Sequence, residues 1–371
     1  MTAFDPLLGS LPPQDHDHDV LLIAGSRPEV ARLAPVAAAF AAADRIRAIT
    51  IASGADPMRV DIAWEDLAVP AEITHLLGRL PGPNPAEIAS SLMTRLDALL
   101  VEQDPTAIVV YGGGMTATVA AQVAYWRQIP VIHMQAGAAT DDLLCPFPQE
   151  ANRRIIGQLA SLVLAAGGSE RAASGPNVIV TGDPVHANPA PSDLRFGELL
   201  DRIRNGSRHL VLVNLERPRS AGVLDGLPGL LAREADTEVV VWGTQAGSDA
   251  ALNLAQHERV IVVPDIALSE LVRLVPLSAV VVSDDDQLVA DAPGLGAPAV
   301  HVEGTGIPEP GDSIRSISVT AVMSTVGQML RAAPRVEEFD GREAARVEQA
   351  VAWMFGLSPS SKLSAPQAST G

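Results

Sequence analysis

The chain is poor in several features that would assign it to a class at once. Cys145 is its only cysteine, which excludes an internal disulfide framework and a cysteine-cluster zinc site. Aromatic residues make up only 3% of its 371 residues. No apolar run reaches the roughly 18 residues of a membrane-spanning helix. The N-terminus is acidic and lacks the apolar core of a signal peptide, so we expect a cytoplasmic protein.

Basic residues are scarce as well. The chain has 26 Lys and Arg against 44 Asp and Glu, which gives a net charge of −18. Such a charge repels nucleic acid and anionic membrane surfaces, and we expect neither as a partner. No P-loop, G-x-S-x-G, H-E-x-x-H or Cys/His zinc pattern occurs, so neither a metal nor a cofactor is predicted.

Short β-branched runs alternate with alanine- and leucine-rich helical patterns along the chain. This alternation is typical of an α/β protein with a doubly wound parallel sheet. The runs form two series, and we predict strands at residues 20–24, 49–52, 107–110, 131–133, 162–165 and 178–180, then at 209–213, 237–242, 260–263, 279–282 and 299–302. Two series predict two domains that face a central cleft.

The predicted boundaries follow from these series. The first domain spans residues 19–190 and the second spans residues 205–337, with a helix at 338–355 inside a final segment, 338–357. Residues 1–18 and 358–371 are rich in Ser, Pro, Asp and Gly, and we expect them to be disordered tails.

Five segments carry motifs in a recognisable order. They read VLLIAGSRPEVARLAP from residue 20, VVYGGGMTAT from 109, IHMQAGAATDD from 132, PFPQEANRR from 146 and VTGDPV from 180. The set resembles the non-hydrolysing UDP-N-acetylglucosamine 2-epimerases, whose motifs read roughly GTRPEAIKMAP, HGDTTTT, HVEAGLRT, PWPEEANR and VTGNTV. The resemblance implies a GT-B-like pair of Rossmann-like halves, a last helix that returns to the first half, a UDP-linked nucleotide sugar as ligand, and a homodimer.

The resemblance also implies a chemistry. A family enzyme removes the proton at C2 of the sugar, expels UDP and adds it back with the opposite configuration, which requires groups that exchange protons near neutral pH. Gly113 matches the aspartate of the second motif, while Gln135 and Gln149 match glutamates. Glutamine does not titrate. Glu150 and Arg153 agree with the family, so the implied catalytic positions are matched only in part.

The implied substrate-binding positions are mixed too. Arg32 replaces a lysine, and Glu216 replaces the histidine of the family's GHRREN segment while Arg217 is kept. The positions that the resemblance assigns to substrate binding are Arg27, Glu29, Arg32, Gly113, His133, Glu216, Arg217, Asp285, Asp286 and Asp291. For His133 a structural role competes with a catalytic one.

The phosphate-binding segment differs most. The family's TDSGGIQEEAP corresponds to SDDDQLVADAP at residues 283–293, so that Asp285 and Asp286 replace a serine and a glycine, and Asp291 replaces the ribose-binding glutamate. Three interpretations stay open. The acids form a helix cap, they fill a vacated anion site at a helix N-terminus, or they hold Mg²⁺ against a diphosphate.

Three functional hypotheses result. The first is an epimerase-like protein whose catalysis is altered or lost and which is retained to bind a ligand or a partner protein. The second is an active isomerase or other enzyme on UDP-N-acetylglucosamine or a related nucleotide sugar, with Glu29, Glu150, Glu216 or Asp285 in rearranged roles. The third is different chemistry on a different ligand. The joint loss of acids, histidine and loop glycines favours the first.

Overall fold

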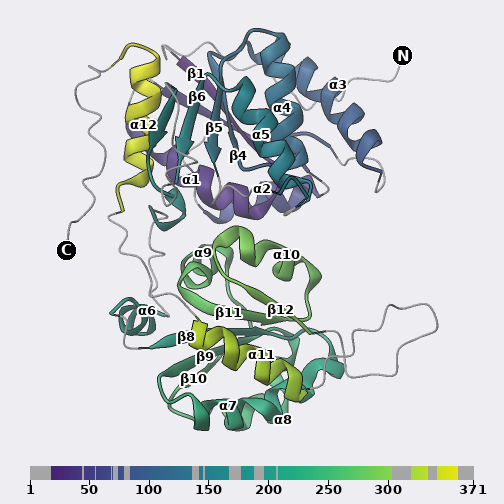
Figure 1. Cartoon of the computed structure of the whole chain (residues 1–371), viewed down its shortest axis with the longest axis vertical. Helices are drawn as coiled ribbons and strands as arrows, with labels where there is room; N and C mark the ends of the chain where they lie inside the picture. Colours follow the sequence, from purple (N-terminus) through teal and green to yellow (C-terminus); the bar gives the residue numbers. More distant parts are fainter. Residues whose placement is uncertain are drawn as a thin grey trace. The chain divides into compact units, whose positions relative to one another are not determined.

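The computed structural model describes residues 18–43, 46–54, 56–67, 69, 74–78, 84–135, 142–144, 147–166, 177–187, 196–205, 208–302, 319–332 and 341–357. These residues fall into two compact units, one drawn from residues 1–189 and 340–371 and the other from 190–339 (Figure 1). Cys145, the connection between the domains predicted at 188–194, residues 1–17 and the predicted tail at 358–371 lie outside the described residues.

The first unit is built on a seven-stranded sheet in which every strand pair is parallel. The strands lie in the order β3-β2-β1-β4-β5-β6-β7. Their bounds are β1 His18–Ala24, β2 Ile46–Ala52, β3 Thr74–Leu76, β4 Ala107–Tyr111, β5 Val131–Gln135, β6 Leu162–Ala165 and β7 Val178–Val180. Every residue of β4 is buried, as expected for a sheet covered on both faces.

The helices of this unit form two groups. The first group is α3 Pro85–Gln103, α4 Met115–Trp126 and α5 Gln149–Leu159, which share one apolar cluster with the strands. The second is α1 Arg27–Ala42, α2 Pro57–Asp66, α12 Glu343–Met354 and the 3₁₀ turn η1 Pro184–Ala187, in which α1 contacts each of the others. The last helix of the chain thus packs against α1.

Two sequence-based bounds need correction. The final helix begins at Glu343 and not at residue 338, because Gly341 has a φ of 68°, a left-handed conformation that interrupts an α-helix. His18, which we assigned to the disordered tail, is the first residue of β1 and pairs with Ile46. Its ring stacks on Phe355 with the centroids 4.4 Å apart. The strand therefore includes His18 and Asp19, two polar residues that do not belong to a β-branched run.

The second unit repeats the plan with five parallel strands in the order β10-β9-β8-β11-β12. The strands are β8 His209–Asn214, β9 Thr237–Trp242, β10 Val260–Val262, β11 Ser278–Ser283 and β12 Ala299–His301. Around them lie α6 Gly197–Arg204, η2 Pro218–Gly226, α7 Leu227–Arg233, η3 Thr244–Gly247, α8 Asp249–Leu254, α9 Leu268–Leu274, η4 Val275–Leu277, α10 Asp286–Leu295 and α11 Val319–Ala332. Strands β8, β9 and β11 share an apolar core with α7 and α11.

Strand order reverses once in each sheet. The reversal lies between β1 and β4 in the first unit and between β8 and β11 in the second. Ligands of open parallel sheets bind at the carboxyl ends of the strands at such a reversal. The loops that follow these four strands are therefore where a site is sought in each unit. Within the described residues, no helix is both long and apolar enough to span a membrane.

Candidate active site

Several of the sequence-predicted residues follow the strands at the two strand-order reversals. In the first unit Glu29 follows β1 and Gly113 follows β4, while in the second Glu216 follows β8 and Asp285 follows β11. Parallel strands that neighbour each other bring these loops together at one sheet edge. The ten predicted substrate-binding positions divide equally between the units, and the four predicted catalytic positions all belong to the first.

Glu29 closes the loop after β1. The backbone N–H of Gly25 donates to its carboxylate at 2.6 Å, and the residue is 9% exposed. Arg27, at the start of α1, is half-buried. The Glu29 side chain is thus held at the N-terminal turn of α1, where a carboxylate is stabilised by the helix dipole.

Arg32 is a buried cation with an internal partner. Its guanidinium donates to the Asp183 carboxylate at 3.0 Å, and its Nη1 donates to the Pro28 carbonyl at 3.3 Å. The same group lies over the ring of Tyr111, 4.9 Å from the centroid. Burial raises the pKa of Tyr111 well above its usual range, so the phenol stays neutral. The charge of Arg32 is therefore already balanced by Asp183.

Gly113 lies directly against the first turn of α5. The Asn152 side chain donates to the Gly113 carbonyl at 3.0 Å. A Cβ built on Gly113 would lie 2.2 Å from the Gln149 carbonyl oxygen and 3.1 Å from the Arg153 amide nitrogen, whereas ordinary contacts begin at 3.4 Å. Backbone of α5 thus fills the space that any side chain at this position would need.

Glu150 is held by two arginines of its own helix. Its carboxylate is 3% exposed and accepts from Arg153 at 2.8 and 2.9 Å and from Arg154 at 2.8 Å. The Arg153 hydrogen bonds, with help from Arg154, lower the pKa of Glu150 to about 2. A carboxylate this acidic is a weak base at neutral pH.

His133 and Gln135 lie on β5. The His133 ring is fully buried, and its Nε2 lies 2.7 Å from the Gly112 carbonyl, so this nitrogen carries the proton. Burial lowers the pKa of His133 to about 4, which makes the ring neutral at neutral pH. The Gln135 amide lies against Gly157 of α5, and its buried Oε1 has no hydrogen-bond partner among the described residues. These contacts give His133 a role in holding the loop after β4.

In the second unit, the acid that organises the loop is Asp284. It is fully buried, and its carboxylate accepts the backbone N–H groups of Glu216 at 2.8 Å and Arg217 at 2.9 Å. Ser283 adds a second link, because its hydroxyl donates to Asn214 at 3.0 Å and accepts from the Asp285 amide at 2.9 Å. The loops after β8 and β11 are therefore tied to each other.

The sequence analysis singled out Asp285 and Asp286, the two acids that follow Asp284 in the chain, and missed this role of Asp284. The signal that could have found it is its position, directly after the strand at which the order reverses. The side chains of Asp286 and Asp291 lie outside what the structure describes.

A pocket of about 680 Å³ opens beside the loop after β8. Its walls include Leu252, Val262 and Pro264, and two carboxylate residues, Glu216 and Asp265, line it as well. The Glu216 carboxylate accepts from the Asn214 side chain at 3.0 Å. The pocket lies at the carboxyl ends of β8, β9 and β10, with acids where an anionic ligand would require cations.

Two units, each a parallel sheet with one strand-order reversal, place the protein in the class of doubly wound α/β proteins. Comparison with known proteins names the family. Residues 38–347 match the family model described as UDP-N-acetylglucosamine 2-epimerase, so the chain belongs to that family. The fold class and the family that the motifs predicted are both confirmed.

Individual relatives agree. A probable UDP-N-acetylglucosamine 2-epimerase of Ralstonia nicotianae is 24% identical over 311 residues, which covers 77% of this chain and 82% of the relative. The solved structure of a UDP-N-acetylglucosamine 2-epimerase described as putative, from Listeria monocytogenes, has a TM-score of 0.61 at 18% identity, with 95% of this chain and 100% of that chain covered. That of UDP-GlcNAc 2-epimerase from Neisseria meningitidis bound to UDP-GlcNAc has a TM-score of 0.59 at 18% identity, with 90% and 99% covered. The two solved structures share the fold of this chain.

Proposed function

We propose that this protein is a UDP-N-acetylglucosamine 2-epimerase family member that has lost C2 proton transfer and retains the scaffold to bind a UDP-linked nucleotide sugar or a partner protein. The observation that carries the proposal is the contact between Gly113 and the backbone of α5. The catalytic aspartate of the family motif is replaced there, and the space for its side chain is filled as well.

The other aligned positions support the same proposal. Gln135 and Gln149 cannot accept or release a proton. Glu150 can titrate, but its pKa of about 2 leaves it unable to hold a proton at neutral pH. His133 is neutral, and its Nε2 proton is already donated to a backbone carbonyl. Proton exchange at the sugar C2 would need a group with a pKa near neutrality at one of these positions.

Charge balance weakens diphosphate binding in the same region. Arg32 pairs with Asp183, while Arg153 and Arg154 pair with Glu150. A bound diphosphate would have to compete with these internal carboxylates for the guanidinium groups. We therefore expect UDP-linked ligands to bind more weakly here than they bind family enzymes. The role of Asp285 and Asp286 as internal occupants of the anion site remains a prediction.

The experiment that tests the proposal measures binding and turnover on the same sample. Isothermal titration calorimetry with UDP and UDP-N-acetylglucosamine reports affinity, and proton NMR of the same mixture reports the C2 epimer. We expect binding weaker than that of an active family member measured in parallel, and no epimer. Epimer formation at the rate of an active family member run in parallel would contradict the proposal.

The second candidate function, an enzyme with rearranged residues, is favoured by one observation. Glu29 is a buried carboxylate at the strand-order reversal. If this group were the base, Glu29→Gln would abolish turnover, whereas Glu150→Gln would not. An activity that survives both changes would exclude both residues as the base.

We also propose that the protein is a homodimer through α3, α4 and α5, which pack side by side. These helices expose large apolar side chains, with Trp126 at 65%, Val101 at 58%, Tyr125 at 56% and Ile155 at 43%. Apolar side chains gathered on neighbouring helices are typical of a contact surface. Trp126→Glu should therefore yield monomers in light scattering after gel filtration. Trp353→Glu, on another exposed tryptophan, should not, and a monomeric wild-type protein would contradict the dimer.

A further inference from the structure

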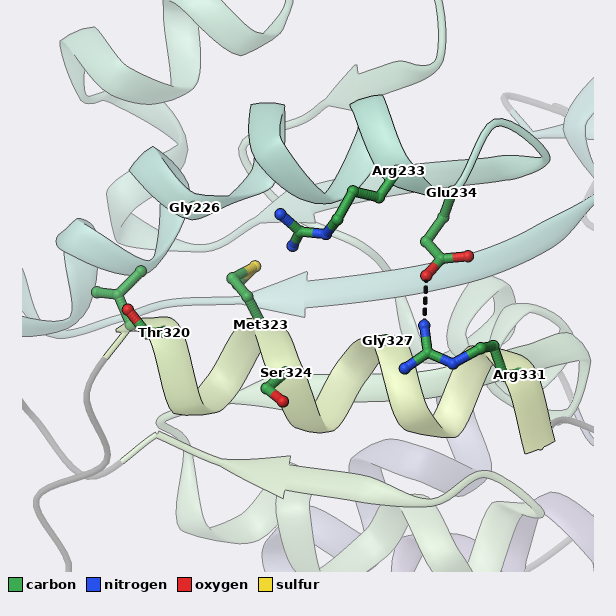
Figure 2. Close-up of a pocket in the computed structure, with 9 residues that line it drawn as sticks. Gly226, Arg233, Glu234, Thr320, Met323, Ser324, Gly327 and Arg331 are labelled. Carbon is green, nitrogen blue, oxygen red and sulfur yellow. Dashed lines mark hydrogen bonds and ion pairs between the residues drawn. The ribbon is translucent and has the colours of Figure 1, made fainter.

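A groove lies between α7 and α11 in the second unit (Figure 2). Its volume is about 480 Å³, within the range of small-molecule sites. Arg233 and Glu234 mark one end of it. Because α7 ends at Arg233 and β9 begins at Thr237, this end lies where the strands begin. The groove is therefore distinct from the loops after β8 and β11, which lie at the opposite edge of the sheet.

Arg233 supplies the hydrogen-bond donors of the groove that have no partner among the described residues. Figure 2 shows its guanidinium extended over the space between the two helices, above Met323. Within the described part of the chain, this guanidinium makes no hydrogen bond and no ion pair. A cation in the last turn of a helix is favoured by the helix dipole. Because no described residue accepts a hydrogen bond from this guanidinium, the five N–H donors of Arg233 are available to an acceptor from outside.

A second guanidinium lies at the same end. Nη1 of Arg331 donates to the Glu234 carboxylate at 2.7 Å, so the charges of these two residues neutralise each other. The positive charge of Arg233 is then left without a negative partner among the residues that line the groove. The groove therefore carries a net positive charge in a chain whose net charge is −18. Most of the surface repels an anion, so such a groove is where an anion would bind.

Gly327 keeps the space beside these charges open. A Cβ at this position would lie 3.4 Å from Nη1 and 3.8 Å from Nη2 of Arg331, and 3.6 Å from the Glu234 carboxylate. Any longer side chain at residue 327 would extend into the groove next to the ion pair. At the other end the helices close tightly, because a Cβ on Gly226 would lie 2.7 Å from Met323.

We propose that this groove binds a small organic oxyanion, with the Arg233 guanidinium as its principal donor and the Arg331 guanidinium beside it. A planar guanidinium binds carboxylate or phosphate oxygens through paired hydrogen bonds, and both ligand classes satisfy the same donors. The proposal is independent of the proposed function, because none of these residues belongs to the aligned site.

The test is titration calorimetry at low salt on the full chain with three probes: inorganic phosphate, glycerol 3-phosphate and succinate. Saturable binding at one site per chain is expected for at least one probe. Phosphates alone would assign the ligand to phosphate esters, and succinate alone would assign it to carboxylates. No saturable binding of any probe would overturn the proposal.

Variants locate the site. Arg233→Gln should weaken binding at least about tenfold, since hydrogen bonds to charged groups contribute that much or more. Gly327→Leu keeps every charge but fills the groove, and it should abolish binding. Arg59→Gln removes an exposed arginine from α2 in the other unit and should change nothing. Equal affinity in Arg233→Gln and Arg59→Gln would overturn the assignment.

Discussion

Replacing Gly113 by alanine tests the contact on which the proposed loss of activity depends. The new Cβ must move from 2.2 Å to about 3.4 Å from the Gln149 carbonyl oxygen, so the first turn of α5 has to retreat by about 1.2 Å. Overpacking of this kind costs about 1–3 kcal/mol. Loss of the bond from Asn152 to the Gly113 carbonyl adds about 1 kcal/mol. We expect a total of about 2–4 kcal/mol.

Equilibrium unfolding in urea measures this free energy. Gly247→Ala is the matched control, because a Cβ there would meet nothing within 4 Å. That variant should be as stable as the wild type. Gly113→Asp, which restores the family's residue, should destabilise at least as much as alanine and should not restore epimerisation. A Gly113→Ala variant that unfolds at the same urea concentration as the wild type would show that α5 does not fill this space.

Two further predictions concern buried charge. Asp183→Ala leaves the buried Arg32 guanidinium without its carboxylate and should lower the free energy of unfolding by about 3 kcal/mol. Asp97→Ala breaks an exposed ion pair and should change the free energy of unfolding little. Similar losses of stability in the two variants would be inconsistent with a buried Arg32–Asp183 pair. His133 is neutral when folded, with a pKa of about 4 against 6.5 in the unfolded chain. Between pH 4 and pH 6.5 the imidazole of His133 is therefore protonated in the unfolded chain but not in the folded one. The stability that comes from keeping His133 neutral is complete above pH 6.5 and is lost as the pH falls towards 4. Urea midpoints across this range should fall less in His133→Gln than in wild type, and parallel curves would exclude His133 as the cause.

Much of the fold could be predicted from the sequence, because a parallel sheet covered on both faces consists of short apolar β-branched runs. β3 was missed because its three residues, THL at Thr74–Leu76, form no run of β-branched apolar residues, whereas β7, equally short, reads VIV. The end of β1 at His18 depends on a ring contact with Phe355, more than 300 residues away in sequence. Such long-range contacts are not encoded in local pattern.

The candidate site, too, could be predicted from the sequence only in part. Motif spacing located Gly113, but the element that occupies its side-chain space is α5, and only the packing of the two loops shows this. In the second unit the sequence drew attention to Asp285 and Asp286, whereas the carboxylate that binds the backbone of Glu216 and Arg217 belongs to Asp284. Residue type is visible in a run of three acids, but which of them turns inward is decided by the tertiary structure.

Exchange of the C2 proton tests the loss of catalysis most directly, because it detects proton removal even when no net epimer accumulates. The wild-type protein is incubated with UDP-N-acetylglucosamine in heavy water, and the C2 position is followed by proton NMR and mass spectrometry beside an active family enzyme. We predict full retention of the C2 proton with this protein while the active enzyme replaces it with deuterium. Deuterium incorporation at C2 above the protein-free control would contradict the proposal that proton transfer has been lost.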